Sequence, residues 1–145
     1  MVKQAGAVAL GVMLAGAAGA ADWRLAGESD RAVSYLDLAS VAKTGDTARF
    51  SRWMVLRAPL SSGADNLKDS FEANCATRAY RVVSAQAFKG ERDAGRMAAT
   101  AAVAEPGTVT ASLIAIACGT RKAEGAAVAD PYLAGKERLT PAPAR

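Results

Sequence analysis

The sequence predicts an α+β domain, in which a meandering antiparallel β-sheet of about five to six strands carries one C-terminal helix that is tethered to it by a disulfide. Three observations support this fold class. Apolar and polar residues alternate with a period of two through most of residues 22–103, as in strands that bury one face. After Glu105-Pro106-Gly107 the apolar residues recur at intervals of three and four, as in a helix. The chain also has two cysteines, one in each part.

The N-terminus predicts export. Lys3 precedes an unbroken run of Ala, Gly, Val, Leu and Met from 5 to 18, and small residues lead up to Ala20. This pattern is typical of a signal peptide, residues 1–20, cleaved after Ala20 or Ala21. The run is shorter than the roughly 20 residues that span a bilayer, so no transmembrane segment is predicted. No cysteine follows the cleavage site to accept a lipid anchor, which favours a periplasmic or secreted protein and leaves surface exposure open.

The strands are predicted from alternation and from the turns between them. Lys43-Thr44-Gly45-Asp46 is a strong turn signal, because Gly45 readily adopts a positive φ. The longest candidate, 47–57, is ambiguous: Phe50, Met54 and Leu56 share one side with Arg52, so its buried face is left open. The predicted strands are 22–28, 32–37, 47–57, 67–75, 78–88 and 97–103, with a turn at 90–95 before the last.

The helix is predicted over 109–117. Thr108 is a suitable N-cap, Val109, Leu113 and Ile116 form one apolar face, and Gly119 is a suitable stop. The β-branched residues leave a buried strand as the alternative, but the helix is favoured. Residues 21–119 then form one domain. Residues 120–145, rich in Ala, Pro and charge, are expected to be a flexible tail in which Tyr132 and Leu133 are the candidates for local docking.

The order of several short segments resembles the surface-adhesin protein E family of small exported bacterial proteins. These segments are "ADWRLAGESD", "YLDLASV", the "KTGD" turn, "WMVLR", a strand with cysteine followed by "RAYRVVSAQAF", and a Pro-Gly-led helix that ends in cysteine. The resemblance covers residues 22–119. It implies an antiparallel sheet with a C-terminal helix, joined by a Cys75–Cys118 disulfide, and a role in adhesion to host matrix.

The residues themselves also favour this disulfide. Outside the cytoplasm cysteines tend to pair, and here one ends a strand while the other lies on the last turn of the helix. A catalytic redox pair is more often close in sequence, as in Cys-Xaa-Xaa-Cys. A structural disulfide is therefore predicted.

Catalytic sites are disfavoured by the residue inventory. The chain contains no histidine, which excludes a Ser-His-Asp triad and any zinc or haem site that needs histidine. Asp65, Asp69 and Glu72 are interpreted as solvated turn residues rather than as a glycosidase pair. No catalytic residue, metal site or cofactor is predicted. The net charge of +4 is spread without a dense Lys/Arg run, so nucleic acid is not an expected partner.

The best binding candidate is a row of outward side chains on the 47–57 strand. If Phe50 points inward, Arg49, Trp53 and Arg57 line up outward, and Arg and Trp are enriched at binding hot spots. The alternative is that Trp53 packs beneath the helix while the arginines extend to solvent.

The sequence therefore predicts a non-enzymatic, adhesin-like envelope protein that binds a protein or an anionic ligand through its sheet face or edge. Edge pairing would also allow a homodimer. The alternative function is a periplasmic inhibitor or accessory subunit of a cell-wall enzyme, with the basic 89–96 segment inserted into a cleft.

Overall fold

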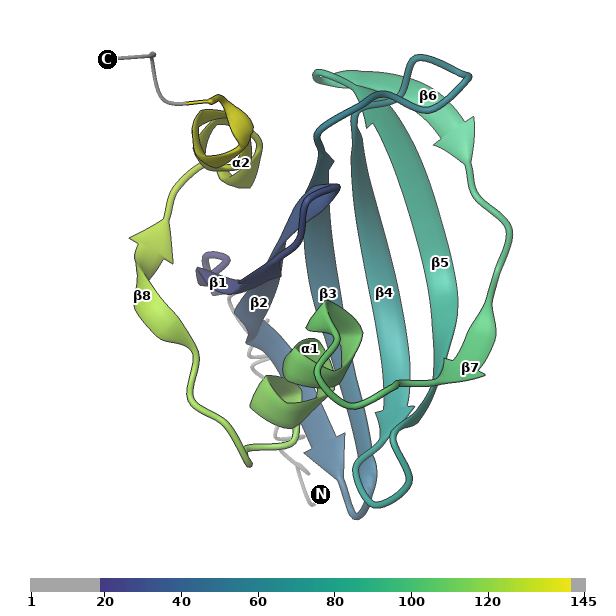
Figure 1. Cartoon of the computed structure of the whole chain (residues 1–145). Coiled ribbons are helices and arrows are strands. Elements are labelled where there is room, and N and C mark those ends of the chain that lie inside the picture. The colour runs from purple at the N-terminus through teal and green to yellow at the C-terminus, as the bar shows by residue number, and fades with distance from the viewer. Residues whose placement is uncertain (1–18, 142–145) are drawn as a thin grey trace, which may run out of the picture.

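A computed structural model describes residues 19–141, so most of the predicted signal peptide lies outside the described residues. Within them the chain forms one sheet and two helices (Figure 1). The strands are β1 (Trp23–Glu28), β2 (Ala32–Thr44), β3 (Thr47–Leu56), β4 (Asn66–Asn74), β5 (Ala79–Lys89), β6 (Arg92–Arg96), β7 (Ala101–Val103) and β8 (Glu124–Val128). The helices are α1 (Val109–Ala117) and α2 (Pro131–Leu139).

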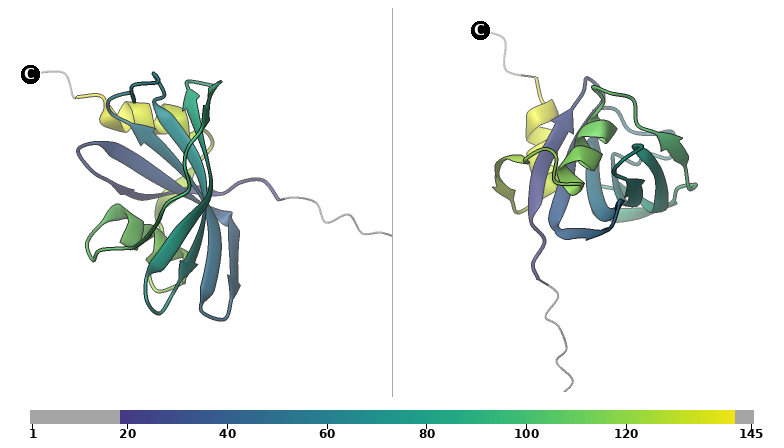
Figure 2. Two further views of the ribbon diagram at one scale, coloured as in Figure 1. Left: turned by 90° about the vertical axis from the view of Figure 1, so that its right-hand side faces the viewer. Right: turned by 90° about the horizontal axis from the view of Figure 1, so that it is seen from below.

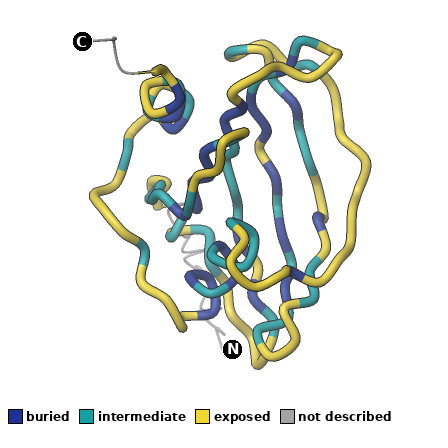
Figure 3. The backbone as a smooth tube through the Cα atoms, viewed as in Figure 1, coloured by how far each residue is buried: buried dark blue, intermediate teal, exposed yellow. Residues whose placement is uncertain are grey.

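The sheet is an antiparallel meander with an added strand at one edge. The strand order is β6-β5-β4-β3-β2-β1-β8, and β7 pairs with β5 beyond the end of β6. The prediction of five to six strands is wrong, because the described sheet has eight. One extra strand is β6, which begins inside the expected 90–95 turn, and the other is β8. Both are exposed along most of their length, as is β7 (Figure 3).

The expected flexible tail is also wrong in part, because residues 120–141 contain β8 and a second helix. Asp130 caps α2 by accepting hydrogen bonds from the amides of Tyr132 and Leu133, and Pro131 begins the helix. The aspartate N-cap and a proline in the first turn are both favourable at a helix start. Residues 19–141 thus contain two helices where one was predicted.

The two helices cover opposite faces of the sheet, near different ends of its long strands (Figures 1 and 2). The alternation of side chains along β2 and β3 shows that the two helices lie on opposite faces. Leu36 and Phe50 belong to the cluster beneath α1, whereas Tyr35 and Val55 belong to the cluster beneath α2. Neighbouring residues of a strand point to opposite faces. We call the side of Phe50 the inner face and the side of Val55 the outer face.

The inner face carries the larger core and the disulfide. Phe50 and Phe71 stack with ring centroids 5.1 Å apart, and Leu113 and Ile116 of α1 are buried in the same cluster. Thr108 caps α1 as predicted, accepting a hydrogen bond from the Ala111 amide. The Cys75–Cys118 disulfide is confirmed, and it joins the end of β4 to the end of α1.

The outer face carries a second core under α2. Val33, Tyr35, Val55 and Leu139 are buried there. The helix approaches β3 closely at Gly135, where a Cβ atom would lie 2.6 Å from a methyl group of Val55. Since real Cβ atoms are not found that close to other heavy atoms, only glycine fits at this point of α2 without displacement.

One charged pair is enclosed in the inner core. Arg52 pairs with Asp69 on the neighbouring strand, and the two side chains are 13% and 3% exposed. The Arg52 guanidinium also lies 4.8 Å from the centre of the Phe71 ring. Burial raises the pKa of Asp69, and the charge of Arg52 opposes this shift. Asp69 is therefore a core residue of β4, and the expectation of a solvated turn residue is wrong.

Candidate binding surface

The outer face is covered by α2 at the Val55 end of β3 and is open beyond it. Across β3, β4 and β5 the register places Arg49 opposite Glu72, and Glu72 opposite Arg81. The side chains of Arg49 and Arg81 are 70% and 60% exposed, whereas that of Glu72 is 22% exposed. We call the exposed surface of Arg49, Lys68, Glu72 and Arg81 the open face.

Glu72 is held between the two arginines. Arg49 Nε donates to Glu72 Oε2 at 2.8 Å, and Arg81 Nε donates to Glu72 Oε1 at 3.2 Å. Burial acts to raise the pKa of Glu72, but hydrogen bonds and charges from Arg49 and Arg81 outweigh it and lower this pKa. The carboxylate stays ionised and neutralises one of two guanidinium charges, so the triplet keeps a net positive charge.

A shallow depression of about 380 Å³ adjoins this triplet. It is lined by Glu72 and Arg81 and by Thr47, Asn74 and Tyr80 around them. Ala73, Ala79 and Ala101 complete the lining. The two arginines beside the depression give this surface a positive charge that is suited to an anionic group.

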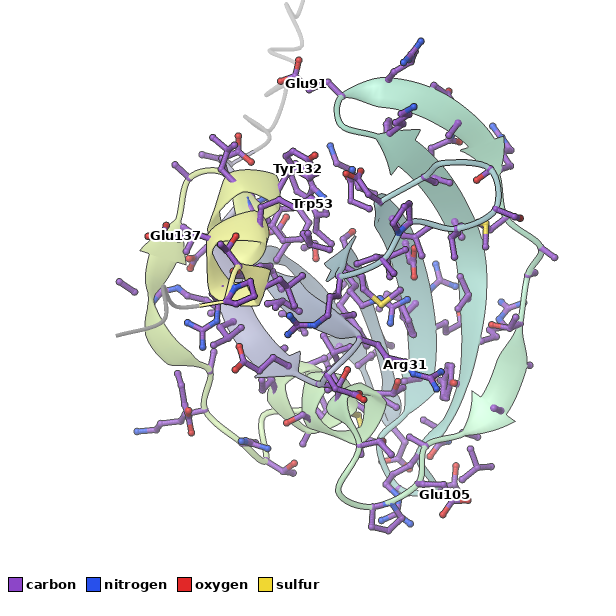
Figure 4. The ribbon with its side chains drawn as sticks, turned by 45° about the horizontal axis from the view of Figure 1, so that its top comes forward. Arg31, Trp53, Glu91, Glu105, Tyr132 and Glu137 are labelled. Carbon is purple, nitrogen blue, oxygen red and sulfur yellow. A yellow bond between two sulfur atoms is a disulfide. The ribbon has the colours of Figure 1, made fainter. Side chains whose placement is uncertain are left out.

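Trp53 lies on the same face as Arg49, but its side chain is in contact with neighbouring residues. Its Nε1 donates to Asn66 Oδ1 at 3.0 Å, and Lys68 Nζ lies 3.8 Å from the centre of its ring. Trp23 packs against it edge-on at 5.6 Å between centroids. Figure 4 shows Trp53 beside Tyr132 at the start of α2. Trp53 is thus half-buried and packs beside α2, a helix that the sequence did not predict.

Arg57 lies apart from Arg49, at the far end of α2. Its Nε donates to the Asp30 carbonyl at 2.6 Å, and a terminal guanidinium nitrogen donates to the Leu139 carbonyl at 2.8 Å. A cation at the last carbonyls of a helix is stabilising. The structure therefore places Arg49 on the open face, Trp53 under the edge of α2, and Arg57 at the end of that helix. The three do not form one continuous row.

A cluster around Asp65 was missed from the sequence. Asp65 Oδ2 accepts from the Tyr132 hydroxyl at 2.9 Å and from Lys136 Nζ at 3.0 Å, while Oδ1 accepts from the Gly90 amide and from Asn66 at 3.0 Å each. Burial alone would raise the pKa of Asp65, but these hydrogen bonds together lower it far below its usual value. This carboxylate joins the β3–β4 loop to α2 and to the β5–β6 turn.

Between residues 19 and 141, His, Cys, Asp and Glu do not come together in groups of three or more that would hold a metal ion. The same stretch contains no helix that is both long and apolar enough to span a membrane.

The comparisons with known proteins agree with this architecture. The family model described as "Surface-adhesin protein E" matches residues 23–119. A solved structure of Haemophilus influenzae protein E is similar, with a TM-score of 0.52 and 17% sequence identity, over 68% of this chain and 88% of that chain. At 17% identity, this similarity shows a shared fold and nothing more. No curated protein sequence matches. The family match spans β1 to α1 and ends before β8 and α2. On that match, this chain belongs to the surface-adhesin protein E family.

Proposed function

We propose that the protein is an exported, non-enzymatic binding protein of the bacterial envelope that holds an anionic partner on its open face. Family membership supports an adhesin-like surface protein, and the leader sequence supports export. The observation that carries the proposal is the Arg49–Glu72–Arg81 triplet, in which two exposed guanidinium groups share one carboxylate. A sulfate or carboxylate group of a ligand would pair with the guanidinium edges that Glu72 leaves free.

The binding test uses a sulfated polysaccharide as the probe. The protein without residues 1–20 should bind immobilised heparin at low ionic strength, and binding should weaken as NaCl is added, because exposed charges are screened. The double variant Arg49→Glu/Arg81→Glu should lose binding by about tenfold or more. Circular dichroism of each variant checks that the sheet is retained.

A matched control separates the open face from overall charge. Arg31→Glu/Arg92→Glu makes the same change in net charge at two exposed arginines outside the triplet. This variant should keep most of the affinity. If the two double variants lose the same affinity for heparin, binding depends on net charge alone. The open face would then not be the binding site.

Export to the cell surface has its own test. If the protein acts as an adhesin, protease added to intact cells should degrade it. Degradation only after the outer membrane is permeabilised would place the protein in the periplasm and contradict an adhesive role. For the purified protein without residues 1–20, size-exclusion chromatography with light scattering would detect a homodimer formed through the exposed sheet edges.

A further inference from the structure

A groove separates β8 from α2 on the outer face, in the part of the chain that follows the family match. Its volume is about 660 Å³, within the range of roughly 300–1,000 Å³ that is usual for small-molecule sites. Leu25 and Tyr35, which are register partners on β1 and β2, contribute to its floor. Ala126 and Ala127 line it from β8, and Ala134 lines it from α2.

The groove exists because β8 does not follow β1 closely. The five residues of β8 pair with β1 only at Trp23↔Val128 and Leu25↔Glu124, with an irregularity between the two pairs. Gly125 has a φ of +78°, a conformation that glycine adopts without strain. The strand therefore arches away from its neighbour, and the alanines of the arch are too small to fill the space that it leaves.

The floor contains a buried hydroxyl without a partner. Tyr35 is 1% exposed, and its hydroxyl makes no hydrogen bond with any of the residues that the structure describes. Burying a hydroxyl in this way costs free energy that a hydrogen bond would recover. Such a group in the lining of a groove is the feature expected of a ligand-binding site, where a few polar groups orient a mainly apolar molecule.

The charges at the rim disfavour an anionic ligand. Glu124 and Glu137 line the groove with Arg138, and Arg138 Nε already donates to Glu28 Oε2 at 2.8 Å. Figure 4 shows Glu137 on the side of α2 that faces β8. The Arg138–Glu28 pair is about half exposed, and such surface pairs separate at little cost. Arg138 lines the same groove as Tyr35, so movement of the Arg138 side chain would widen the approach to Tyr35.

We propose that this groove binds a small, free, uncharged amphiphile with one short hydrocarbon chain and an ester or ether oxygen. The chain would lie on Leu25, Ala127 and Ala134, and the oxygen would accept a hydrogen bond from Tyr35. The size of the groove suits a single small molecule rather than a membrane surface. This inference is independent of the open face, because it uses different residues and a different ligand chemistry.

The test is a displacement assay with the full mature chain. The neutral fluorophore N-phenyl-1-naphthylamine should brighten when the protein is added. Monooctanoylglycerol, below its micelle concentration, should displace it, while octanoate should be about tenfold weaker because the carboxylates of the rim repel it. Failure of the fluorophore to bind, or equal competition by octanoate, would overturn the proposal.

Two variants and one control variant assign the site. Tyr35→Phe removes only the unpaired hydroxyl, so it should weaken monooctanoylglycerol by about fivefold relative to the fluorophore. Ala134→Phe should block the groove, whereas Leu133→Phe, on the exposed side of the same helix, should not. Unchanged monooctanoylglycerol binding by Tyr35→Phe would refute the assignment. Co-flotation of the protein with phosphatidylcholine vesicles would show a membrane surface to be the true ligand.

Discussion

Asp65 joins α2 to two loops of the sheet. Its carboxylate accepts hydrogen bonds from the Tyr132 hydroxyl and the Lys136 ammonium group of the helix, and from the Gly90 amide of the β5–β6 turn. These donors come from segments far apart in sequence. Hydrogen bonds to a charged, partly buried acceptor are stronger than those between neutral groups. A single side chain thus fixes one end of α2 against the sheet.

This arrangement predicts a pH-dependent effect of Asp65→Asn. The folded protein lowers the pKa of Asp65, so the contribution of this group is present above the unfolded value of about 3.9 and is lost as the pH falls below it. At pH 7 the variant should be less stable by about 1–3 kcal/mol. Urea unfolding between pH 7 and pH 3 should show the difference between wild type and variant shrinking with acidification.

The control for this prediction is Asp46→Asn, in the exposed turn between β2 and β3. It should change the free energy of unfolding by less than about 0.5 kcal/mol, as is usual for surface substitutions. A deficit of Asp65→Asn that stays constant down to pH 3 would mean that the charge of the carboxylate is not what stabilises the network.

Among the elements, α1 depends on the disulfide. The helix has only nine residues, too few to be stable without tertiary contacts. Cys75 and Cys118 are 43 positions apart, and closing such a loop stabilises a protein by roughly 4 kcal/mol in the chain-entropy model. Cys75→Ser/Cys118→Ser should therefore lower the free energy of unfolding by about 3–4 kcal/mol, measured by urea titration followed by circular dichroism.

A second measurement keeps this prediction specific. Adding a reductant to the wild-type protein should lower its urea midpoint toward that of the double variant and leave the variant unchanged. If the reductant has no effect on a wild-type sample whose thiols are shown to be reduced by mass spectrometry, the disulfide contributes little to stability.

The two helices also show which elements can be predicted from sequence. The start and the end of α1 are marked locally by Pro106-Gly107, Thr108 and Gly119, and its apolar face is clear, so its bounds follow from the sequence. The start of α2 is marked by Asp130 and Pro131. Its buried residues, however, are Pro131, Gly135 and Leu139, and only the last is a large apolar side chain. Hydrophobic periodicity gives no signal for a helix that packs through a glycine.

The strand β6 and the arrangement of the candidate binding residues could not be predicted from the sequence, for related reasons. The sequence of β6, Arg92–Arg96, has no apolar alternation, and this strand is held by backbone pairing with β5. The parity of β3 correctly places Arg49 and Trp53 on one face. The separation of Arg57 could not be predicted, because it follows from the contact with the end of α2. The missed helix on the outer face thus accounts for the packing of Trp53 and for the separation of Arg57 from Arg49.

At the scale of the whole molecule, the sheet is stabilised from both faces by separate cores. The inner core is closed by α1 and the disulfide, and the outer core by α2. The two cores share β1, β2 and β3. Both tryptophans of the chain, Trp23 and Trp53, belong to the outer core. Tryptophan fluorescence therefore reports on the docking of α2 and not directly on α1.

This division predicts the behaviour of a mature chain that ends at Val128 and lacks α2. The inner core and its disulfide should persist, because none of their residues lies beyond Val128. The outer face would expose Val33, Tyr35 and Val55, at a cost of about 3–5 kcal/mol of stability. Tryptophan emission should shift to longer wavelength, and the exposed apolar patch should drive self-association, seen by light scattering.

Leu133→Ala, at a residue that is 63% exposed, should change neither property. A truncated chain that stays monomeric with unshifted emission would show that α2 is not needed to cover the outer face.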